Sequence, residues 1–208
     1  MKKSKKKKKS NTWKIKQHRD QFFKKSKTLG YRSRSAFKLI ELNKKYKFIK
    51  KNTKLLDIGG YPGGWAQVAS KIIKSGKILS IDIKKMDHLK NVSFLQCDFL
   101  EESSKEKILS FFDDKLDVVI SDMAANTSGN KSLDSIRTNQ LCAEVVEFSS
   151  KILKPNGVLV SKLFMGDDFL EVKELAKSRF KKVEFFKPEA SRNESRETYL
   201  HCVTLRTL

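Results

Sequence analysis

The sequence has little cysteine and no long apolar run. Its 208 residues include three cysteines, Cys97, Cys142 and Cys202, which lie far apart in apolar stretches. Because this spacing provides neither a disulfide framework nor a CxxC pair, we expect free thiols and no metal site. No stretch approaches the roughly 18 apolar residues of a membrane span, and no apolar signal segment follows the first lysine run. We therefore expect a cytoplasmic protein that does not bind a membrane.

Acidic residues are scarce in the first quarter of the chain. Residues 1–54 contain 22 Lys and Arg but only two acids, Asp20 and Glu41, which gives this part a net charge of +20. The remaining residues contain 23 basic and 22 acidic side chains, a net charge of +1. A nearly neutral body thus follows a strongly basic segment, which indicates a polyanionic partner such as nucleic acid.

The composition predicts one folded domain behind a tail. Residues 2–10 consist of seven lysines and two serines, which cannot bury enough apolar surface to fold, so we expect a disordered Lys-rich tail over residues 1–12. With 38% hydrophobic residues, the rest of the chain, 13–208, can form a single domain with its own core. Within its basic part, 13–53, a helical pattern begins at Ser33 and places Ala36, Phe37 and Ile40 on one face.

Short β-branched runs then alternate with longer amphipathic segments. We expect strands at 54–57, 77–82, 92–98, 117–122 and 158–164, and helices at 64–74, 103–112, 136–153 and 167–179. Two further strands, 183–186 and 199–205, are joined by a polar loop too short for a helix. The pattern predicts a Rossmann-like α/β fold with a mostly parallel seven-stranded sheet, helices on both faces and an antiparallel hairpin at one edge.

Distinctive residues follow the predicted strands. A glycine-rich turn over 57–65 comes after the first strand, Asp82, Asp98 and Asp122 end the next three, and Lys162 lies on the fifth. Each of these alone is explained equally well by a turn, a helix cap or a surface lysine. Together they lie where open α/β sheets bind ligands, beyond the carboxyl ends of the strands. We therefore expect a binding site there.

The glycine-rich turn narrows the choice of ligand. It lacks the GxGxxG pattern of dinucleotide sites and the GxxxxGK[ST] pattern of nucleoside triphosphate sites. A nucleoside without a pyrophosphate remains, and S-adenosylmethionine is the obvious candidate. Asp82 has the spacing of an acid that accepts from ribose hydroxyls. Asp98 is placed for the adenine amino group, and the backbone from Gly59 to Gly63 lies beside the methionine portion.

Six motifs carry a resemblance to a known family. They are RSRSAFKL at 32–39, DIG at 57–59, PGGW at 62–65, SDMA at 121–124, KLF at 162–164 and SRETY at 195–199. From about Trp13 to the C-terminus, the chain closely resembles the FtsJ/RrmJ-type 2′-O-ribose methyltransferases, in particular the bacterial enzymes that act on a uridine of 23S ribosomal RNA in the large subunit. It departs from the usual family pattern at Gly60, Tyr61 and Ala125.

The resemblance implies a set of site residues. The family's catalytic Lys-Asp-Lys-Glu tetrad falls on Lys38, Asp122, Lys162 and Glu197. Its cofactor positions fall on Gly63, Trp65, Asp82, Asp98 and Asp122, and the candidate set also includes Asp57 and Gly59 of the glycine-rich turn. The implied cofactor is S-adenosylmethionine.

A ribose hydroxyl is a poor nucleophile, so methyl transfer needs alignment and a place for the proton. We expect Lys162 to contact and deprotonate the hydroxyl, Asp122 to orient Lys162, and Lys38 and Glu197 to position the ribose and balance charge. The four groups titrate as a coupled set, and which protonation state reacts stays open.

Acceptors on the base are less favoured than the sugar. Methylation of pyrimidine C5 needs a cysteine that a neighbouring side chain activates by accepting its proton. The three cysteines lie within predicted strands or a helix, where we expect no such side chain to activate them. Methylation of an exocyclic amine commonly uses an aromatic stacking loop after the fourth strand, where this chain has Met123 to Asn126.

The implied partner is ribosomal RNA, within the large ribosomal subunit, bound by a monomer. A transfer RNA or messenger RNA cap substrate remains possible, as does a non-catalytic RNA-binding assembly factor with the same fold.

Overall fold

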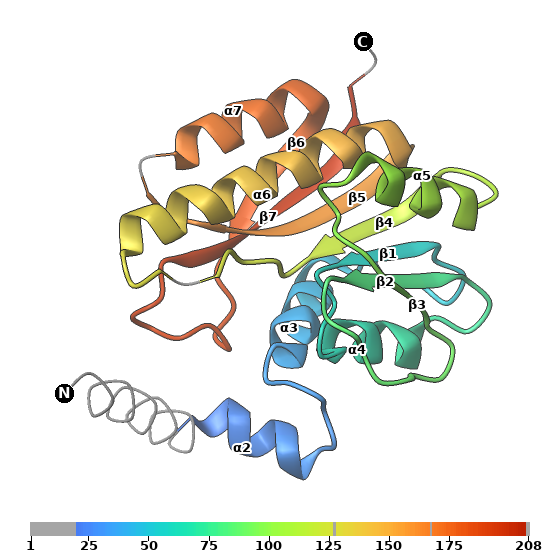
Figure 1. Cartoon of the computed structure of the whole chain (residues 1–208), viewed down its shortest axis with the longest axis horizontal. Helices are drawn as coiled ribbons and strands as arrows, with labels where there is room; N and C mark the ends of the chain where they lie inside the picture. Colours follow the sequence, from blue (N-terminus) through green and yellow to red (C-terminus); the bar gives the residue numbers. More distant parts are fainter. Residues whose placement is uncertain (1–19, 127, 167, 207–208) are drawn as a thin grey trace.

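A mixed sheet forms the centre of the molecule (Figure 1). The computed structural model describes residues 20–126, 128–166 and 168–206, so the tail predicted over 1–12 lies outside it. The described strands follow the spatial order β3-β2-β1-β4-β5-β7-β6. Their bounds are β1 (Leu55–Ile58), β2 (Ile78–Asp82), β3 (Ser93–Gln96), β4 (Leu116–Ser121), β5 (Leu153–Phe164), β6 (Phe180–Phe186) and β7 (Glu197–Leu205).

The strand directions confirm the predicted fold class. β3, β2, β1, β4 and β5 pair in parallel, while β7 is antiparallel to both of its neighbours, β5 and β6. The hairpin of β6 and β7 therefore closes one edge, with β7 on the inside. All parallel strands end on the same side, and this side carries the residues that the sequence singled out.

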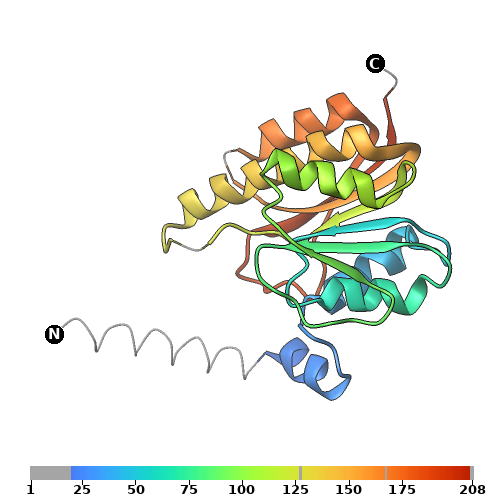
Figure 2. The ribbon, with the colours of Figure 1, turned by 45° about the vertical axis from the view of Figure 1, so that its right-hand side comes forward.

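Helices cover both faces of the sheet (Figure 1, Figure 2). They are α2 (Gln21–Thr28), α3 (Ala36–Tyr46), α4 (Gly64–Ile72), α5 (Glu102–Phe111), α6 (Lys131–Ile152) and α7 (Phe169–Arg179). α3 and α4 lie on one face and α5, α6 and α7 on the other, whereas α2 lies outside these layers on the side of α3. None of the described helices has the length and apolar character that a membrane crossing requires.

Alternating side chains of the strands form two cores. In β1, Leu56 and Ile58 are fully buried in the core shared with α5, α6 and α7, and Leu55 is buried in the core shared with α3 and α4. Strands that are buried on both faces read as nearly continuous apolar runs, which is why their positions were predictable. Asp57 interrupts this run and points away from the α5–α7 core.

Two helices differ most from the prediction, while α4, α5 and α7 agree with it to within two residues at each end. α6 begins at Lys131 rather than 136, because Asn130 caps it by accepting from the backbone N–H groups of Ser132 and Leu133 at 3.0 and 3.2 Å. The first turn of α6 is largely exposed and carries no apolar periodicity. α2 was not predicted at all; Asp20 caps it, but its short, lysine-rich sequence resembles a solvated segment.

Candidate active site

Four charged side chains from four elements meet where the parallel strands end. Lys38 comes from α3, Asp122 follows β4, Lys162 lies in β5, and Glu197 begins β7. The sheet register brings three of them together, because Ser121 pairs with Ser161 and Glu197 pairs with Phe164. Asp122 and Lys162, one step along their parallel strands, therefore become neighbours. These are the four residues of the predicted tetrad.

The tetrad forms a chain of alternating charges. The Lys162 ammonium lies 2.7 Å from Asp122 Oδ1 and 3.9 Å from Glu197 Oε2, and it donates to the backbone carbonyl of Asp122 at 3.0 Å. The Lys38 ammonium lies 2.6 Å from Glu197 Oε1. Lys38, Lys162 and Glu197 are each only 8% exposed. Two cations and two anions thus balance within one nearly buried cluster.

This arrangement shifts the pKa values of Lys162, Asp122 and Glu197 so that each side chain favours its charged form. Burial alone would lower the pKa of Lys162, but the carboxylates of Asp122 and Glu197 raise it above its ordinary value. Burial alone would raise the pKa of Asp122, but the ammonium groups of Lys162 and Lys38 lower it. For Glu197 the raising effect of burial is likewise outweighed by Lys38 and Lys162, and its pKa is lowered. The cluster therefore favours the ammonium form of Lys162.

Tyr199 is a fifth member of the cluster, and sequence reasoning gave it no role. Its hydroxyl donates to Asp122 Oδ1 at 2.6 Å, and the residue is fully buried. Burial, followed by the negative charges of Asp122 and Glu197, raises the pKa of Tyr199 well above its ordinary value, so it stays a donor. The available signal was its spacing: Tyr199 stands two residues after Glu197, on the same face of β7.

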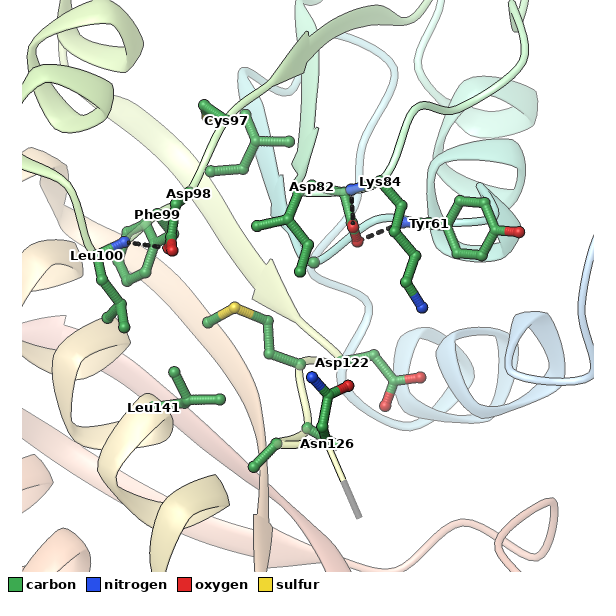
Figure 3. Close-up of a pocket in the computed structure, with 16 residues that line it drawn as sticks. Tyr61, Asp82, Lys84, Cys97, Asp98, Phe99, Leu100, Asp122, Asn126 and Leu141 are labelled. Atoms are coloured by element: carbon green, nitrogen blue, oxygen red, sulfur yellow. Dashed lines mark hydrogen bonds between the residues drawn. The ribbon is translucent and has the colours of Figure 1, made fainter. Parts of the chain in front are cut away.

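A cleft of about 420 Å³ lies next to the tetrad (Figure 3), a size within the range of small-molecule sites. Asp82 ends β2 and Asp98 lies two residues beyond the end of β3, because β3 ends at Gln96 and not at 98 as predicted. Both aspartates stand on one side of the cleft, and Asp122 and Leu141 lie across from them. Gly59 contributes backbone to the wall. Asp122 belongs both to the cleft and to the tetrad.

Backbone hydrogen bonds fix the two cleft aspartates. The carboxylate of Asp82 accepts from the N–H of Tyr61 at 2.9 Å and from the N–H of Lys84 at 2.8 Å. Asp98 accepts from the N–H of Leu100 at 3.0 Å. Each carboxylate is thereby held in place while lone pairs remain for a ligand. No group of three or more His, Cys, Asp or Glu side chains among the described residues could hold a metal ion.

Three predicted cofactor residues support the cleft and do not line it. The Trp65 ring is buried 5.6 Å from the Tyr199 ring, and its Nε1 donates to the backbone carbonyl of Ser35 at 2.9 Å. Gly63 precedes α4 with a φ of 104°. Asp57 is buried beneath the glycine turn, where it accepts from the Ser80 hydroxyl at 3.0 Å. Burial raises the pKa of Asp57 to about 7.

Two glycines of the turn have no room for a side chain. At Gly59, with a φ of 76°, a Cβ would stand 2.3 Å from Cγ of Met123. At Gly60 it would stand 1.9 Å from the Ser80 hydroxyl and 2.8 Å from Asp57 Oδ2. The turn therefore packs directly on the loop after β4 and on the Asp57–Ser80 pair. This packing explains why position 60 is a glycine in this chain, one of the positions at which the sequence departs from the usual family pattern.

The apolar wall of the cleft was missed by sequence reasoning. Its side chains come from several separate segments, and nothing in the sequence distinguishes them from core residues; they are Ile81, Phe99, Leu100, Met123 and Leu141.

With this geometry described, the chain can be compared with known proteins. The profile of the FtsJ-like methyltransferase family matches residues 31–205, which includes all four tetrad residues and the whole cleft. The chain belongs to the FtsJ-like methyltransferase family.

Curated relatives of this FtsJ-like methyltransferase match almost end to end. A protein of Pelagibacter ubique named ribosomal RNA large subunit methyltransferase E is 44% identical over 197 residues, which cover 95% of this chain and 97% of the relative. A protein of the same name from Rickettsia akari is 45% identical over 197 residues, covering 92% and 87% of the two chains.

A solved structure of a Plasmodium falciparum protein, assigned as a ribosomal RNA methyltransferase, has a TM-score of 0.76 at 35% identity. The match covers 84% of this chain and 98% of that one. The fold of this FtsJ-like methyltransferase therefore agrees with that of the Plasmodium falciparum protein.

Proposed function

We propose that this chain transfers a methyl group from S-adenosylmethionine to the ribose 2′-hydroxyl of a uridine in 23S ribosomal RNA of the large subunit. The observation that carries the proposal is the convergence of Lys38, Asp122, Lys162 and Glu197 beside a ligand-sized cleft. The names of the Pelagibacter and Rickettsia relatives support ribosomal RNA as the substrate.

The cleft residues fit the cofactor. S-adenosylmethionine, when bound, supplies a methyl group on a positively charged sulfur, which makes the methyl carbon electrophilic. Asp82 would accept from the ribose hydroxyls of its nucleoside, and Asp98 would accept from the adenine amino group. The apolar wall of the cleft suits the flat purine ring, and the carboxylate of Asp122 attracts positive charge to the end of the cleft nearest the tetrad.

The tetrad would handle the proton of the RNA hydroxyl. The hydroxyl oxygen would bond to the methyl carbon as that carbon leaves the sulfur, and the hydroxyl proton would pass to Lys162. Lys162 must be neutral to accept it, yet Asp122 and Glu197 raise its pKa in the described state. A positive charge brought into the neighbouring cleft opposes this effect by repulsion. We therefore expect Lys162 to release its proton when the site is loaded.

The other groups would hold the geometry. Asp122 fixes the Lys162 amine through the 2.7 Å contact, and Glu197, held by Lys38, lies on the far side of the same amine. Lys38 and Glu197 also line a second recess together with Arg34, Arg192, Glu194 and Ser195. We expect the acceptor ribose to enter from this recess, because Glu197 lines it and also lies 3.9 Å from the Lys162 amine.

Methyl incorporation tests the proposal. Labelled S-adenosylmethionine is incubated with large ribosomal subunits from a strain without this activity, and the labelled nucleotide is mapped by resistance of its 3′ linkage to alkali. We expect one labelled uridine ribose. Lys162→Ala should abolish incorporation while S-adenosylmethionine still binds. Lys177→Ala serves as the control, because the Lys177 ammonium is also paired with a carboxylate, Glu174 at 2.9 Å, but on α7, and neither residue lines the cleft or the recess. Full activity of Lys162→Ala would exclude Lys162 as the group that accepts the proton. Label on a nucleobase would exclude the ribose hydroxyl as the group that accepts the methyl.

A further inference from the structure

A second, larger cleft lies at the opposite end of the sheet. It has a volume of about 690 Å³, and we call it the lysine cleft because it is lined by Lys45, Lys47, Lys50, Lys154 and Lys182. Its floor includes Thr53, just before β1, and Asp117, near the start of β4. The parallel strands begin at these ends (Figure 1). The tetrad lies at the opposite ends, because Asp122 follows β4 and Lys162 lies near the end of β5.

Helix α3 connects the two sites. Lys38 near its first turn belongs to the tetrad, and Lys45 in its last turn belongs to the lysine cleft, as does Lys47 immediately after it. Nine residues of helix correspond to about 14 Å along the axis. A ligand in the lysine cleft is therefore separate from the acceptor nucleotide, yet a large RNA can reach both.

Three of the five lysines are exposed and carry uncompensated charge. Lys154 and Lys182 are paired with carboxylates, Asp117 at 2.7 Å and Glu184 at 2.9 Å. For Lys45, Lys47 and Lys50, no carboxylate of the described residues lies within 4 Å. The cleft thus has a net positive charge, although the part of the chain after residue 54 is nearly neutral. The Lys45 ammonium lies over the Phe186 ring, 4.2 Å from its centroid, which leaves its charge uncompensated. Concentrated cations without carboxylate partners attract a polyanion.

The backbone at Lys47 gives a second, independent indication. Lys47 ends α3 in the left-handed conformation, with φ 54° and ψ 40°. Helix ends of this kind usually carry glycine or asparagine, because a side chain with a Cβ is strained there. A lysine in this position turns a charged side chain into the rim of the cleft at a cost in local strain. Strain of this type concentrates at functional sites.

The aromatic residues of the lysine cleft are already occupied within the protein. The Tyr46 ring stacks on the His201 ring at a centroid distance of 3.8 Å and an angle of 11°, and it contacts Phe186 edge-on at 6.2 Å. Burial lowers the pKa of His201 to about 4, so the imidazole is neutral at physiological pH. The cleft therefore offers ammonium groups to a ligand, and neither a stacking platform nor a titrating cation.

We propose that the lysine cleft is a second RNA-binding site, which binds backbone phosphates of the substrate at nucleotides remote from the acceptor ribose. Because it reads phosphates and not bases, it contributes affinity and orientation without sequence preference. The proposal rests on the proposed function in taking RNA as the substrate, but it concerns binding and not the transfer step.

The test removes the three unpaired charges. Lys45→Gln, Lys47→Asn and Lys50→Gln are combined in a cleft variant, with asparagine at 47 because it tolerates the left-handed backbone. The matched control variant, Lys107→Gln, Lys151→Gln and Lys173→Gln, removes the same charge from α5, α6 and α7, where these lysines also have no carboxylate partner within 4 Å among the described residues. Binding of 23S ribosomal RNA transcribed in vitro is measured over a range of salt concentrations, without methyl donor.

We expect the cleft variant to reduce the salt slope of log K by about two, since each phosphate contact contributes about 0.7–0.9. The control variant should change the slope much less, and turnover at saturating RNA should match the wild type in both. Equal slopes for the two variants would overturn the proposal. If the cleft variant proves unstable, Lys50→Glu, in an exposed loop, provides the same comparison against Lys151→Glu. Because binding is measured without transfer, failure of methylation would count against the proposed function alone.

Discussion

The Tyr199 hydroxyl and the Lys162 ammonium both contact the same oxygen, Oδ1 of Asp122, at 2.6 and 2.7 Å. One carboxylate oxygen thus receives a neutral donor from β7 and a cation from β5. The two strands are adjacent and Tyr199 is the cross-strand partner of Lys162, so the sheet itself fixes this three-group contact. The position of the amine depends on both strands.

Tyr199→Phe tests this contact. The substitution keeps the buried ring but removes a hydrogen bond to a charged group, which contributes about 1.5–3 kcal/mol. We expect turnover to fall about tenfold or more with little change in the affinity for S-adenosylmethionine. Burial raises the pKa of Asp122, and the hydrogen bond from Tyr199 opposes that effect. Without this bond the Asp122 pKa rises, so as the pH is lowered the variant should lose activity at a higher pH than the wild type does. An unchanged pH–rate profile would contradict the role of the hydroxyl.

Gly59→Ala should close part of the cleft, because the added Cβ would stand 2.3 Å from Cγ of Met123. Gly30→Ala is the matched control: its φ of 68° is close to the 76° of Gly59, but a Cβ there meets nothing within 4 Å. Both variants carry the same backbone strain, of about 1 kcal/mol. We expect calorimetry to show at least a tenfold loss of S-adenosylmethionine affinity for Gly59→Ala alone. Equal losses in the two variants would indicate strain and not blockage.

The sequence predicted the fold because its strands are buried on both faces. Largely apolar runs such as Leu55–Ile58 and Leu116–Ser121 fix the strands, and the polar residue at the end of each run marks the ligand side of the sheet. The tetrad could be listed only through family motifs. Its members span the sequence from Lys38 to Glu197; the register of β4, β5 and β7 brings three of them together, and α3 supplies Lys38.

The features that were missed depend on tertiary contacts. Tyr199 reads as an ordinary strand residue until its hydroxyl is seen against Asp122. The lysine cleft combines the end of α3 with the beginnings of three strands, and lysines are so frequent in this chain that no sequence pattern separates Lys47 from the others. Helix α2 depends on the cap at Asp20 and on packing, not on its own propensity.

Asp57 predicts a pH dependence of stability. Burial raises its pKa to about 7, so the folded protein holds this proton more tightly than the unfolded chain, whose carboxyl titrates near about 4. The stabilisation is complete below the unfolded pKa and is lost as the pH rises through about 7. An asparagine side chain cannot ionise, so Asp57→Asn should gain stability relative to the wild type between about pH 4 and pH 8, by at most about 4 kcal/mol.

Urea unfolding of both proteins at pH 4.5, 6 and 8 measures this difference. Taking the difference cancels the titration of all other groups that the substitution leaves unchanged. Ser80→Ala sharpens the comparison, because the Ser80 hydrogen bond lowers the pKa that burial raises. Its loss should move the transition to higher pH. If the difference in unfolding free energy between Asp57→Asn and the wild type stays constant from pH 4.5 to pH 8, Asp57 is ionised over this whole range and its pKa is not raised.

Asp20 predicts how α2 is attached to the domain. Its carboxylate accepts from the N–H groups of Phe22 and Phe23 at 3.0 and 3.2 Å, is paired with Arg34, and lies 3.5 Å from Nε of Arg192. One side chain therefore both caps the helix and ties it to two arginines beside the recess at Glu197. Asparagine retains the cap but not the charge, whereas alanine retains neither.

Hydrogen exchange of the α2 amides separates these two contributions. We expect Asp20→Asn to accelerate exchange moderately through loss of the ion pairs, and Asp20→Ala to accelerate it further by the roughly 1 kcal/mol of a lost cap. Exchange in β1 and β4 should not change in either variant, because these strands are buried away from α2. If Asp20→Asn exchanges as slowly as the wild type, the ion pairs with the arginines do not hold the helix, and packing contacts such as that between the Phe22 and Phe37 rings, 5.6 Å apart, hold it instead.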